Sequence, residues 1–164
     1  KDYLQIISKL KKRNPLIKFS SDFIIGYPGE NEDDFSETIN LIKKIKFINS
    51  YSFIFSPRPG TPASNLETAE TKILKDRLKL FQKISDEIKI EYRRQLLNKR
   101  SEVLFENKLE NQEKYFGRDK YGDPVIVQSK TDLTGKTLKV KIINFNQNSL
   151  FGEIEYNDKR DFAA

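Results

Sequence analysis

Residues 21–35 have the sequence SDFIIGYPGENEDDF, in which an apolar run is followed by a glycine-rich turn and then by an acidic stretch. The apolar run at residues 23–25 is continuous rather than alternating, which is typical of a parallel strand covered on both faces. The glycines of residues 26–30 break the strand, and Asn31 is placed to cap a helix whose first turn is acidic. This stretch therefore predicts a strand, a tight turn and a helix.

The flanking residues extend this pattern into an α/β unit. A strand, a helix and a second strand follow one another with a connection long enough for parallel pairing. Because two parallel strands cannot form a covered sheet by themselves, we expect residues 1–66 to be the end of a larger α/β sheet or barrel. The expected elements are a helix over 1–12, a strand over 17–25, a helix after Asn31 that carries Phe35, Ile39, Ile42 and Ile45 on one face, and a strand over 52–55.

The rest of the chain predicts a long helix and then a small barrel. Residues 67–99 are expected to form an amphipathic helical linker packed on the first segment, either continuous or broken once, with Arg93 and Arg94 in its last turns. At about residue 100 the periodicity becomes alternating. We expect residues 100–157 to form a small closed antiparallel barrel of the oligonucleotide-binding type, and residues 158–164 to be a polar tail. Its strands are expected at 102–106, 115–118, 124–128, 137–143 and 150–156.

Composition excludes several classes of protein. The 164 residues include no Cys and no His, so this stretch alone holds neither a disulfide nor an iron–sulfur cluster and lacks the commonest zinc ligands. No apolar stretch approaches the roughly 18 residues that a membrane span requires. Residues 1–66, 67–100 and 101–164 carry net charges of 10 − 7 = +3, 10 − 6 = +4 and 10 − 11 = −1. The basic excess suits either a polyanionic partner such as RNA or simple solubility. The chain begins at Lys1 and has no Met, so we expect a piece of a longer protein.

Two loops are candidates for ligand binding. Residues 26–30 follow a buried strand and precede a helix, which is where α/β proteins bind ligands, although a tight turn without a ligand has the same pattern. Residues 56–62 contain three prolines, which stiffen the loop around Arg58. Either the loop presents the Arg58 guanidinium to an anion or a nucleobase, or it is a rigid structural crossover. Asp22 is expected either in the interior of a barrel or at the wet end of its strand.

A basic and aromatic surface is expected in the second half. Lys139 and Lys141 share one face of a predicted strand. Arg118, Lys136 and the aromatic residues Tyr115 and Phe116 extend that face into a surface suited to RNA phosphates and bases. The net charge of −1 in this region argues against a strong, indiscriminate polyanion binder.

Taken in order, residues 21–35 (SDFIIGYPGENEDDF) and 51–63 (YSFIFSPRPGTPA) resemble consecutive pieces of the radical-SAM methylthiotransferases. Residues 103–106 (VLFE) and 148–152 (NSLFG) resemble the TRAM module of that family, a small RNA-binding barrel. The resemblance implies the end of a radical-SAM partial TIM-like barrel, followed by a long helix and an OB-like TRAM barrel. The string SPRPGTPA favours the branch that adds a methylthio group to C2 of N6-isopentenyladenosine next to the anticodon, with the threonylcarbamoyladenosine branch as an alternative.

For the full-length protein the resemblance implies S-adenosylmethionine and two 4Fe–4S clusters as cofactors. It also implies that tRNA and an electron donor are partners, that no membrane is bound, that the protein is a monomer, and that its location is cytoplasmic. The cluster cysteines lie outside this sequence, so the fragment is expected to bind no metal or cofactor alone and to contain no catalytic residue. The expected cofactor neighbours are Gly26, Pro28, Gly29, Ser56, Gly60 and Thr61, and the expected RNA-binding residues are Arg58, Arg118, Lys136, Lys139 and Lys141.

Two other classes of function remain as alternatives. One is a free-standing RNA-binding protein whose α/β part is only a scaffold. The other is a complete phosphate-binding enzyme without metal, which is disfavoured because the glycine loop lacks the Lys-Ser/Thr ending of a P-loop.

Overall fold

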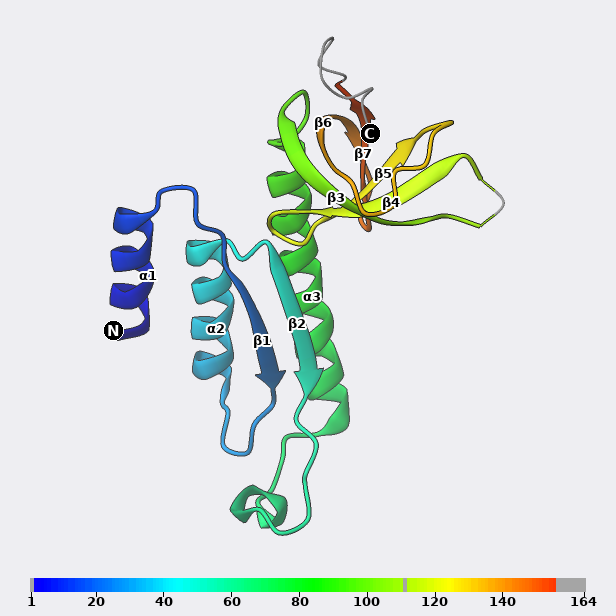
Figure 1. The fold of residues 1–164 in the computed structure, drawn as a ribbon. Coiled ribbons are helices and arrows are strands. Elements are labelled where there is room, and N and C mark those ends of the chain that lie inside the picture. Colours follow the sequence, from blue (N-terminus) through cyan, green and yellow to red (C-terminus); the bar gives the residue numbers. More distant parts are fainter. Residues whose placement is uncertain (1, 111, 156–164) are drawn as a thin grey trace. The chain divides into compact units, whose positions relative to one another are not determined.

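The structure is a computed structural model that describes residues 2–110 and 112–155 (Figure 1). The chain divides into two compact units, Lys1–Lys89 and Ile90–Ala164, which are called the first and the second unit below. The division falls inside a helix, so the predicted linker over residues 67–99 is shared between the units. The predicted tail over residues 158–164 lies outside the described residues.

The first unit has the predicted helix–strand–helix–strand order, followed by a long helix. Its two strands pair in parallel, as expected, with Ser20 opposite Asn49 and Ile25 opposite Ile54. The first strand begins three residues later than predicted, and a short 3-10 helix after the second strand was not predicted. The elements are α1 (Asp2–Arg13), β1 (Ser20–Ile25), α2 (Glu32–Ile45), β2 (Asn49–Ile54), η1 (Pro62–Asn65) and α3 (Thr71–Arg94).

Local hydrogen bonds define where α2 begins and ends. The Asn31 side-chain oxygen accepts from the backbone N–H groups of Asp33 and Asp34 at 2.8 and 3.0 Å. The Asp34 carboxylate in turn accepts from the Asn31 N–H at 3.0 Å, which completes a capping box. At the other end Lys46 has a left-handed conformation (φ 60°), and its N–H donates to the Ile42 carbonyl. The predicted cap at Asn31 is confirmed.

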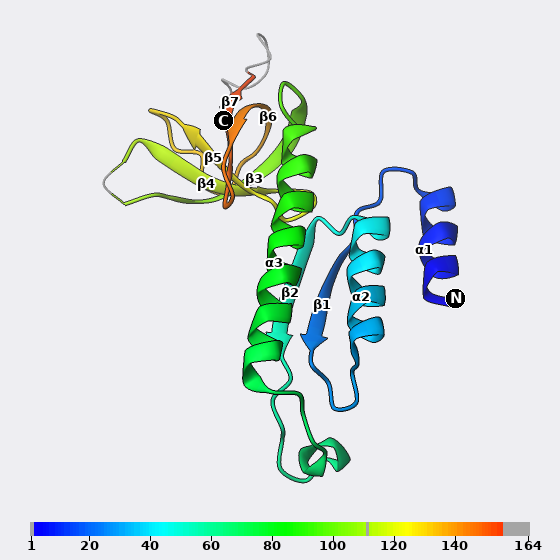
Figure 2. The same ribbon diagram turned by 180° about the vertical axis from the view of Figure 1, so that it is seen from behind.

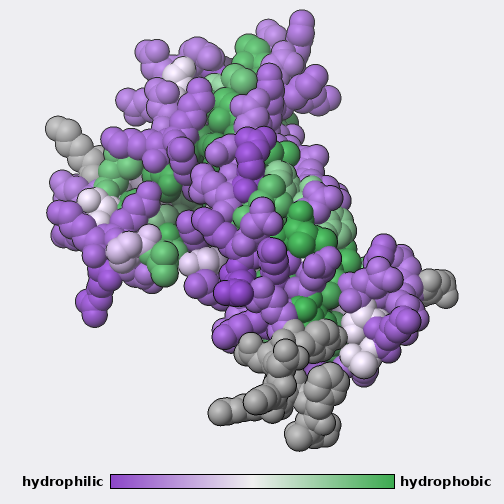
Figure 3. Space-filling view, turned by 90° about the horizontal axis from the view of Figure 1, so that it is seen from above, coloured by the Kyte–Doolittle hydropathy of each residue, from purple (hydrophilic) through white to green (hydrophobic). Residues whose placement is uncertain are grey.

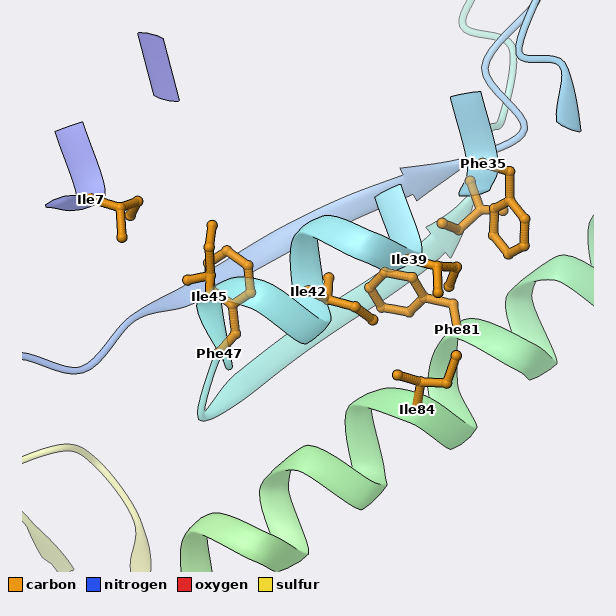
Figure 4. Close-up of a cluster of buried hydrophobic side chains, with 9 residues drawn as sticks. Ile7, Phe35, Ile39, Ile42, Ile45, Phe47, Phe81 and Ile84 are labelled. Atoms are coloured by element: carbon orange, nitrogen blue, oxygen red, sulfur yellow. The ribbon is translucent and has the colours of Figure 1, made fainter. Parts of the chain in front are cut away.

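The core of the first unit lies on one side of the β1–β2 sheet. Figures 1 and 2 show α2 and α3 beside the strands, and Figure 4 shows Phe81 and Ile84 of α3 packed against the apolar face of α2. The opposite face of the sheet is open. Ile24 on β1 is 59% exposed, and Tyr51 and Phe53 on β2 are each 58% exposed. The apolar strand is therefore covered on one face only by the described part of the chain.

The second unit is a closed five-stranded barrel with the strand order β3-β4-β5-β7-β6. Each predicted strand is present, with ends that differ by a few residues. The pair β5–β7 is parallel, whereas the prediction was an antiparallel barrel. A ring with an odd number of strands cannot alternate direction all the way round, so at least one neighbouring pair must be parallel. The strands are β3 (Arg100–Lys108), β4 (Lys114–Asp119), β5 (Pro124–Gln128), β6 (Thr137–Phe145) and β7 (Leu150–Ile154).

The barrel interior is filled by alternate side chains of its strands. Val103, Phe105, Val125 and Val140 are each fully buried there. A side chain at Gly152 would bring its Cβ to 2.2 Å from a Val140 methyl group, so glycine is required where β7 passes β6. None of the helices in the described ranges is long and apolar enough to cross a bilayer.

Candidate functional site

The two predicted ligand loops leave the same edge of the β1–β2 sheet. Because the strands are parallel and in register, residues 26–30 and 56–61 both follow carboxyl ends of strands. The Phe55 N–H donates to the Ile25 carbonyl at 2.9 Å, which continues the pairing to the start of the second loop. The Tyr27 and Phe55 rings meet edge to face with centroids 5.2 Å apart. The structure thus brings the two loops together.

The glycines of the first loop have different roles. Gly26 has φ +75°, and a Cβ there would lie 2.1 Å from Cδ2 of Leu74 on α3. Its N–H donates to the Glu30 carboxylate at 3.1 Å, so this amide is already engaged. Gly29 has φ +89° with no atom within 4 Å of a Cβ built there. Gly29 is therefore the position in this loop where a ligand can approach the backbone closely.

Arg77 of α3 holds the first loop, a role that sequence reasoning missed. Its guanidinium donates to the Glu30 carboxylate and to the Glu32 carboxylate, each at 3.0 Å. The guanidinium also lies 5.4 Å from the centroid of the Phe35 ring. The side chains of Arg77 and Glu30 are only 10% and 12% exposed. No local pattern identifies this contact, because Arg77 lies 47 residues from Glu30 and resembles the other cations of the helix.

The second loop is exposed and closed by its own turn. The Thr61 N–H and hydroxyl both donate to the Arg58 carbonyl, at 3.2 and 2.8 Å. Gly60 has φ +82° and open space around it. The side chains of Ser56 and Arg58 are exposed, which leaves them accessible from solvent. Their predicted roles toward a cofactor and RNA stay predictions.

Asp22 lies on the open face of the sheet, in register with Tyr51. Its neighbours on this face, Ile24 and Phe53, are also paired with each other. If further strands closed this sheet into a barrel, the open face would line the interior, where Asp22 was expected. The face offers an apolar, partly aromatic wall with one carboxylate.

Three hollows of the described part of the chain lie away from the two loops. A hollow of about 500 Å³ lies between α1 and α2, one of about 380 Å³ lies beside β2 and α3, and one of about 450 Å³ lies near the end of β3. None of these three hollows is lined by a predicted cofactor residue. Among residues 2–110 and 112–155 no cluster of three or more His, Cys, Asp or Glu side chains is placed to hold a metal ion.

In the second unit the predicted RNA-binding cations are all exposed, but each has an acidic neighbour. Lys139 is opposite Glu102 and Lys141 is opposite Glu153 in the strand registers. The Lys136 charge helps to lower the pKa of Asp132, after the hydrogen bonds from Thr134. The acidic neighbours reduce the positive potential that the lysines would present to a polyanion, although Lys141 is also opposite Arg100 on β3.

Arg118 and the aromatic residues beside it do not all share one surface. The Arg118 guanidinium lies 3.1 Å from the Glu106 carboxylate and 5.3 Å from the centroid of the Phe116 ring. Phe116 is half-buried on the outside of the barrel. Tyr115, which was expected to extend the RNA surface, is 3% exposed and belongs to the barrel core. The expectation for Tyr115 is wrong because successive residues of a strand face opposite sides.

A buried ion pair joins the end of α3 to the barrel. The Arg93 guanidinium donates to the Asp123 carboxylate at 2.8 Å and to the carbonyls of Asn146 and Asn148 at 2.8 and 3.4 Å. Nearby, burial raises the pKa of Asp119, and the negative charge of Asp123 adds to this effect. The ion pair ties the end of α3 to two turns of the second unit, whereas the ionised form of Asp119 is disfavoured by burial. None of these contacts was predicted.

Comparison with known proteins identifies a domain family within the second unit. Residues 94–154 match the TRAM domain family, and that range runs from Arg94, the last residue of α3, through the five barrel strands. The second unit is thus a TRAM domain, as the sequence predicted.

Five relatives that match almost the whole chain share the name tRNA-2-methylthio-N(6)-dimethylallyladenosine synthase. The protein of that name from Pelagibacter ubique (strain HTCC1062) is 49% identical over 99% of this chain, which spans 36% of that relative. The proteins from Wolbachia pipientis subsp. Culex pipiens (strain wPip) and Ehrlichia canis (strain Jake) are 39% and 38% identical over 92% and 93% of the chain, which spans 35% and 36% of them. The chain is homologous to these tRNA-2-methylthio-N(6)-dimethylallyladenosine synthases over almost its whole length and spans about a third of theirs, which confirms the resemblance seen in the sequence.

Proposed function

We propose that the chain is the carboxyl-terminal part of a tRNA methylthiotransferase that adds a methylthio group to C2 of N6-isopentenyladenosine next to the anticodon. The observation that carries this proposal is the 49% identity to the Pelagibacter ubique relative, which runs over 162 residues and so includes both units. A shared TRAM domain alone would support RNA binding only. Identity that extends through the α/β unit supports the same enzyme.

In this proposal the first unit contributes the last strands of a radical-SAM barrel. S-adenosylmethionine, bound at a 4Fe–4S cluster whose cysteines lie outside this sequence, would supply the radical chemistry. The fit of the loops supports a place beside that cofactor, because Gly29 and Gly60 both have positive φ and open space for close backbone approach. Pro28, Ser56 and Thr61 would border the same ligand. Gly26 instead positions the loop against α3, because its N–H donates to the Glu30 carboxylate and Leu74 fills the space where a Cβ would lie.

The second unit would hold the substrate tRNA. A TRAM domain in the same chain as part of a tRNA-modifying barrel suits an RNA contact, and the exposed cations of this unit would add a salt-dependent component. An electron donor for cluster reduction is a further partner in this proposal. The surface seen in Figure 3 is largely hydrophilic with smaller hydrophobic patches, and both kinds of surface are used in RNA recognition.

A chimeric enzyme tests the proposal. The matching segment of the Pelagibacter ubique enzyme is replaced by this chain, and the chimera is expressed in a bacterium that lacks its own methylthiotransferase. Mass spectrometry of tRNA nucleosides is expected to show 2-methylthio-N6-isopentenyladenosine. A second chimera with the segment of the Wolbachia relative checks that the junctions tolerate a foreign segment.

Other results would contradict the proposal. If the Wolbachia chimera is active and this one leaves N6-isopentenyladenosine unmodified, the chain does not belong to that enzyme. If 2-methylthio-N6-threonylcarbamoyladenosine forms instead, the substrate is that of the related branch.

A further inference from the structure

We propose that the TRAM domain binds unpaired RNA bases by stacking them on an outward-facing row formed by Phe116, Ile126 and Phe151. These three residues are called the stacking row below. The inference rests on the proposed RNA-binding function of the second unit and names the surface that performs it. Ile126 and Phe151 were not among the residues expected from the sequence to contact RNA.

Strand register places the three side chains side by side. Phe116 of β4 is opposite Ile126 of β5, and Ile126 is opposite Phe151 of β7. Directly paired residues of neighbouring strands point to the same side of a sheet. Their sequence neighbours Tyr115 and Leu150 are 3% and 0% exposed in the barrel core. The stacking row therefore faces outward, and each of its members is half-buried rather than covered.

Cations flank the aromatic end of the row. Lys114 and Arg118 lie two residues before and after Phe116 on the same outward face of β4, and both are exposed. The Arg118 guanidinium lies 5.3 Å from the Phe116 ring centroid. An aromatic ring between two cations is the arrangement that accepts a base on the ring and its phosphates on the cations. This charge pattern favours RNA over an apolar protein partner.

The spacing of the rings suits consecutive unpaired bases. Phe116 and Phe151 are separated by two strand spacings, or about 10 Å. In the proposed arrangement one unpaired base lies on each ring, with the Ile126 side chain between the two bases. Bases in a double helix have no free faces, so the row is expected to select single-stranded RNA, such as an anticodon loop.

We expect Lys139 and Lys141 of β6 to contribute less to RNA binding than the stacking row does. Lys139 and Lys141 each lie opposite a glutamate, Glu102 and Glu153. Arg118 also has an acidic neighbour, Glu106. The row, however, does not depend on charge alone, because stacking needs only an accessible ring.

Tryptophan reporters locate the RNA directly, since the chain contains no Trp. Phe151→Trp places a fluorophore in the stacking row, and Thr137→Trp places one on the outward face of β6 beside the lysines. The whole chain carrying either reporter is titrated with a short single-stranded RNA and with the same RNA annealed to its complement. We expect the single strand to quench the fluorescence of the Phe151→Trp variant and to leave that of the Thr137→Trp variant unchanged. The duplex is expected to quench the Phe151→Trp variant more weakly.

Affinity measurements complete the test. The double variant Phe116→Leu/Phe151→Leu keeps apolar bulk but removes both rings, and its affinity for single-stranded RNA should fall at least about tenfold. Lys139→Ala/Lys141→Ala should lose less. Circular dichroism confirms that both variants remain folded. As a further control, size-exclusion chromatography shows whether the row instead joins two copies of the chain.

Each contrary outcome has its own meaning. Quenching of the Thr137→Trp variant alone, or full affinity in the ring-deficient variant, would overturn the stacking row and leave RNA binding by the unit intact. Dimers that the ring-deficient variant loses, with RNA affinity unchanged, would assign the row to self-association. If the unaltered chain binds no RNA at low salt, the proposed RNA-binding function fails and the stacking row fails with it.

Discussion

The Arg93 guanidinium and the Asp123 carboxylate form an ion pair at 2.8 Å in which the two side chains are 0% and 1% exposed. The same guanidinium donates to the carbonyls of Asn146 and Asn148 in the turn between β6 and β7. The end of α3, the turn before β5 and the turn before β7 are thus joined by one side chain. These bonds lie within the second unit, which begins at Ile90 and so includes the end of α3.

We predict that Arg93→Met lowers the free energy of unfolding of the second unit by about 3–5 kcal/mol, because it leaves the Asp123 carboxylate buried without a partner. Urea denaturation followed by circular dichroism measures the change. Arg94→Met is the matched control, since the Arg94–Glu91 pair is 61% and 50% exposed and should matter by less than about 1 kcal/mol.

The double variant Arg93→Met/Asp123→Leu separates the two contributions. It removes both charges together and should recover part of the stability that Arg93→Met loses. Equal stability of Arg93→Met and Arg94→Met would show that the buried pair contributes no more than the exposed one.

The acid dependence of stability is expected to report on Asp119. Burial raises its pKa above the ordinary value of 3.8, although hydrogen bonds from Asp123 and Tyr121 work in the other direction. The folded protein therefore binds this proton more tightly than the unfolded chain does. As pH rises from about 3.8 through the raised pKa, this group makes the free energy of unfolding fall.

Asp119→Asn should remove that contribution. The asparagine oxygen can still accept from the N–H groups of Tyr121 and Asp123, which now bind Oδ1 at 2.8 and 2.9 Å. We expect the variant to gain stability relative to the unaltered chain as pH rises toward neutrality, measured by urea denaturation at a series of pH values. A difference in stability that is independent of pH would contradict the assignment.

Short-range patterns predicted the elements well. Apolar spacing and the cap at Asn31 depend on residues within one helical turn, and the structure has both. Register and long-range pairing were not predictable in the same way. Alternation shows that Phe151 faces outward, but only the pairing of β4, β5 and β7 shows that it lies in line with Phe116.

Buried arginines were missed for a related reason. Arg77 and Arg93 lie in a helix rich in exposed Lys and Arg. Arg77 follows Leu74 by three residues and precedes Phe81 by four, so the helical spacing places it on the apolar face but does not show its partner. Their partners Glu30 and Asp123 are 47 and 30 residues away. The expectation that Gly26 borders a ligand stays a prediction. The structure adds a packing role for this glycine, because a Cβ there would meet Leu74.

We predict that Gly26→Ala destabilises the first unit more than Gly60→Ala does. Both glycines have positive φ, +75° and +82°, so alanine is strained at either position by about 1 kcal/mol. Only at position 26 does the new methyl group meet another side chain, 2.1 Å from Leu74, which adds about 1–3 kcal/mol of overpacking. Thermal denaturation of both variants measures the difference. Equal losses would mean that the Leu74 contact relaxes at no cost.

The contact between Arg77 and Glu30 should control the mobility of the first loop. Without the guanidinium, the Glu30 carboxylate, which is only 12% exposed, becomes an unpaired charge and is expected to turn toward water. This movement would break the hydrogen bond that the Gly26 N–H now donates to the carboxylate. In Arg77→Met we therefore expect hydrogen exchange at the Gly26 amide to accelerate by about tenfold or more, as measured by NMR. Glu32→Gln is the control, because Glu32 also pairs with Arg77 but its side chain is 74% exposed. In this variant the Gly26 amide should exchange at nearly the rate of the unaltered chain. If Arg77→Met folds and the Gly26 amide exchanges as slowly as before, the loop is held by its contact with Leu74 and not by the ion pair.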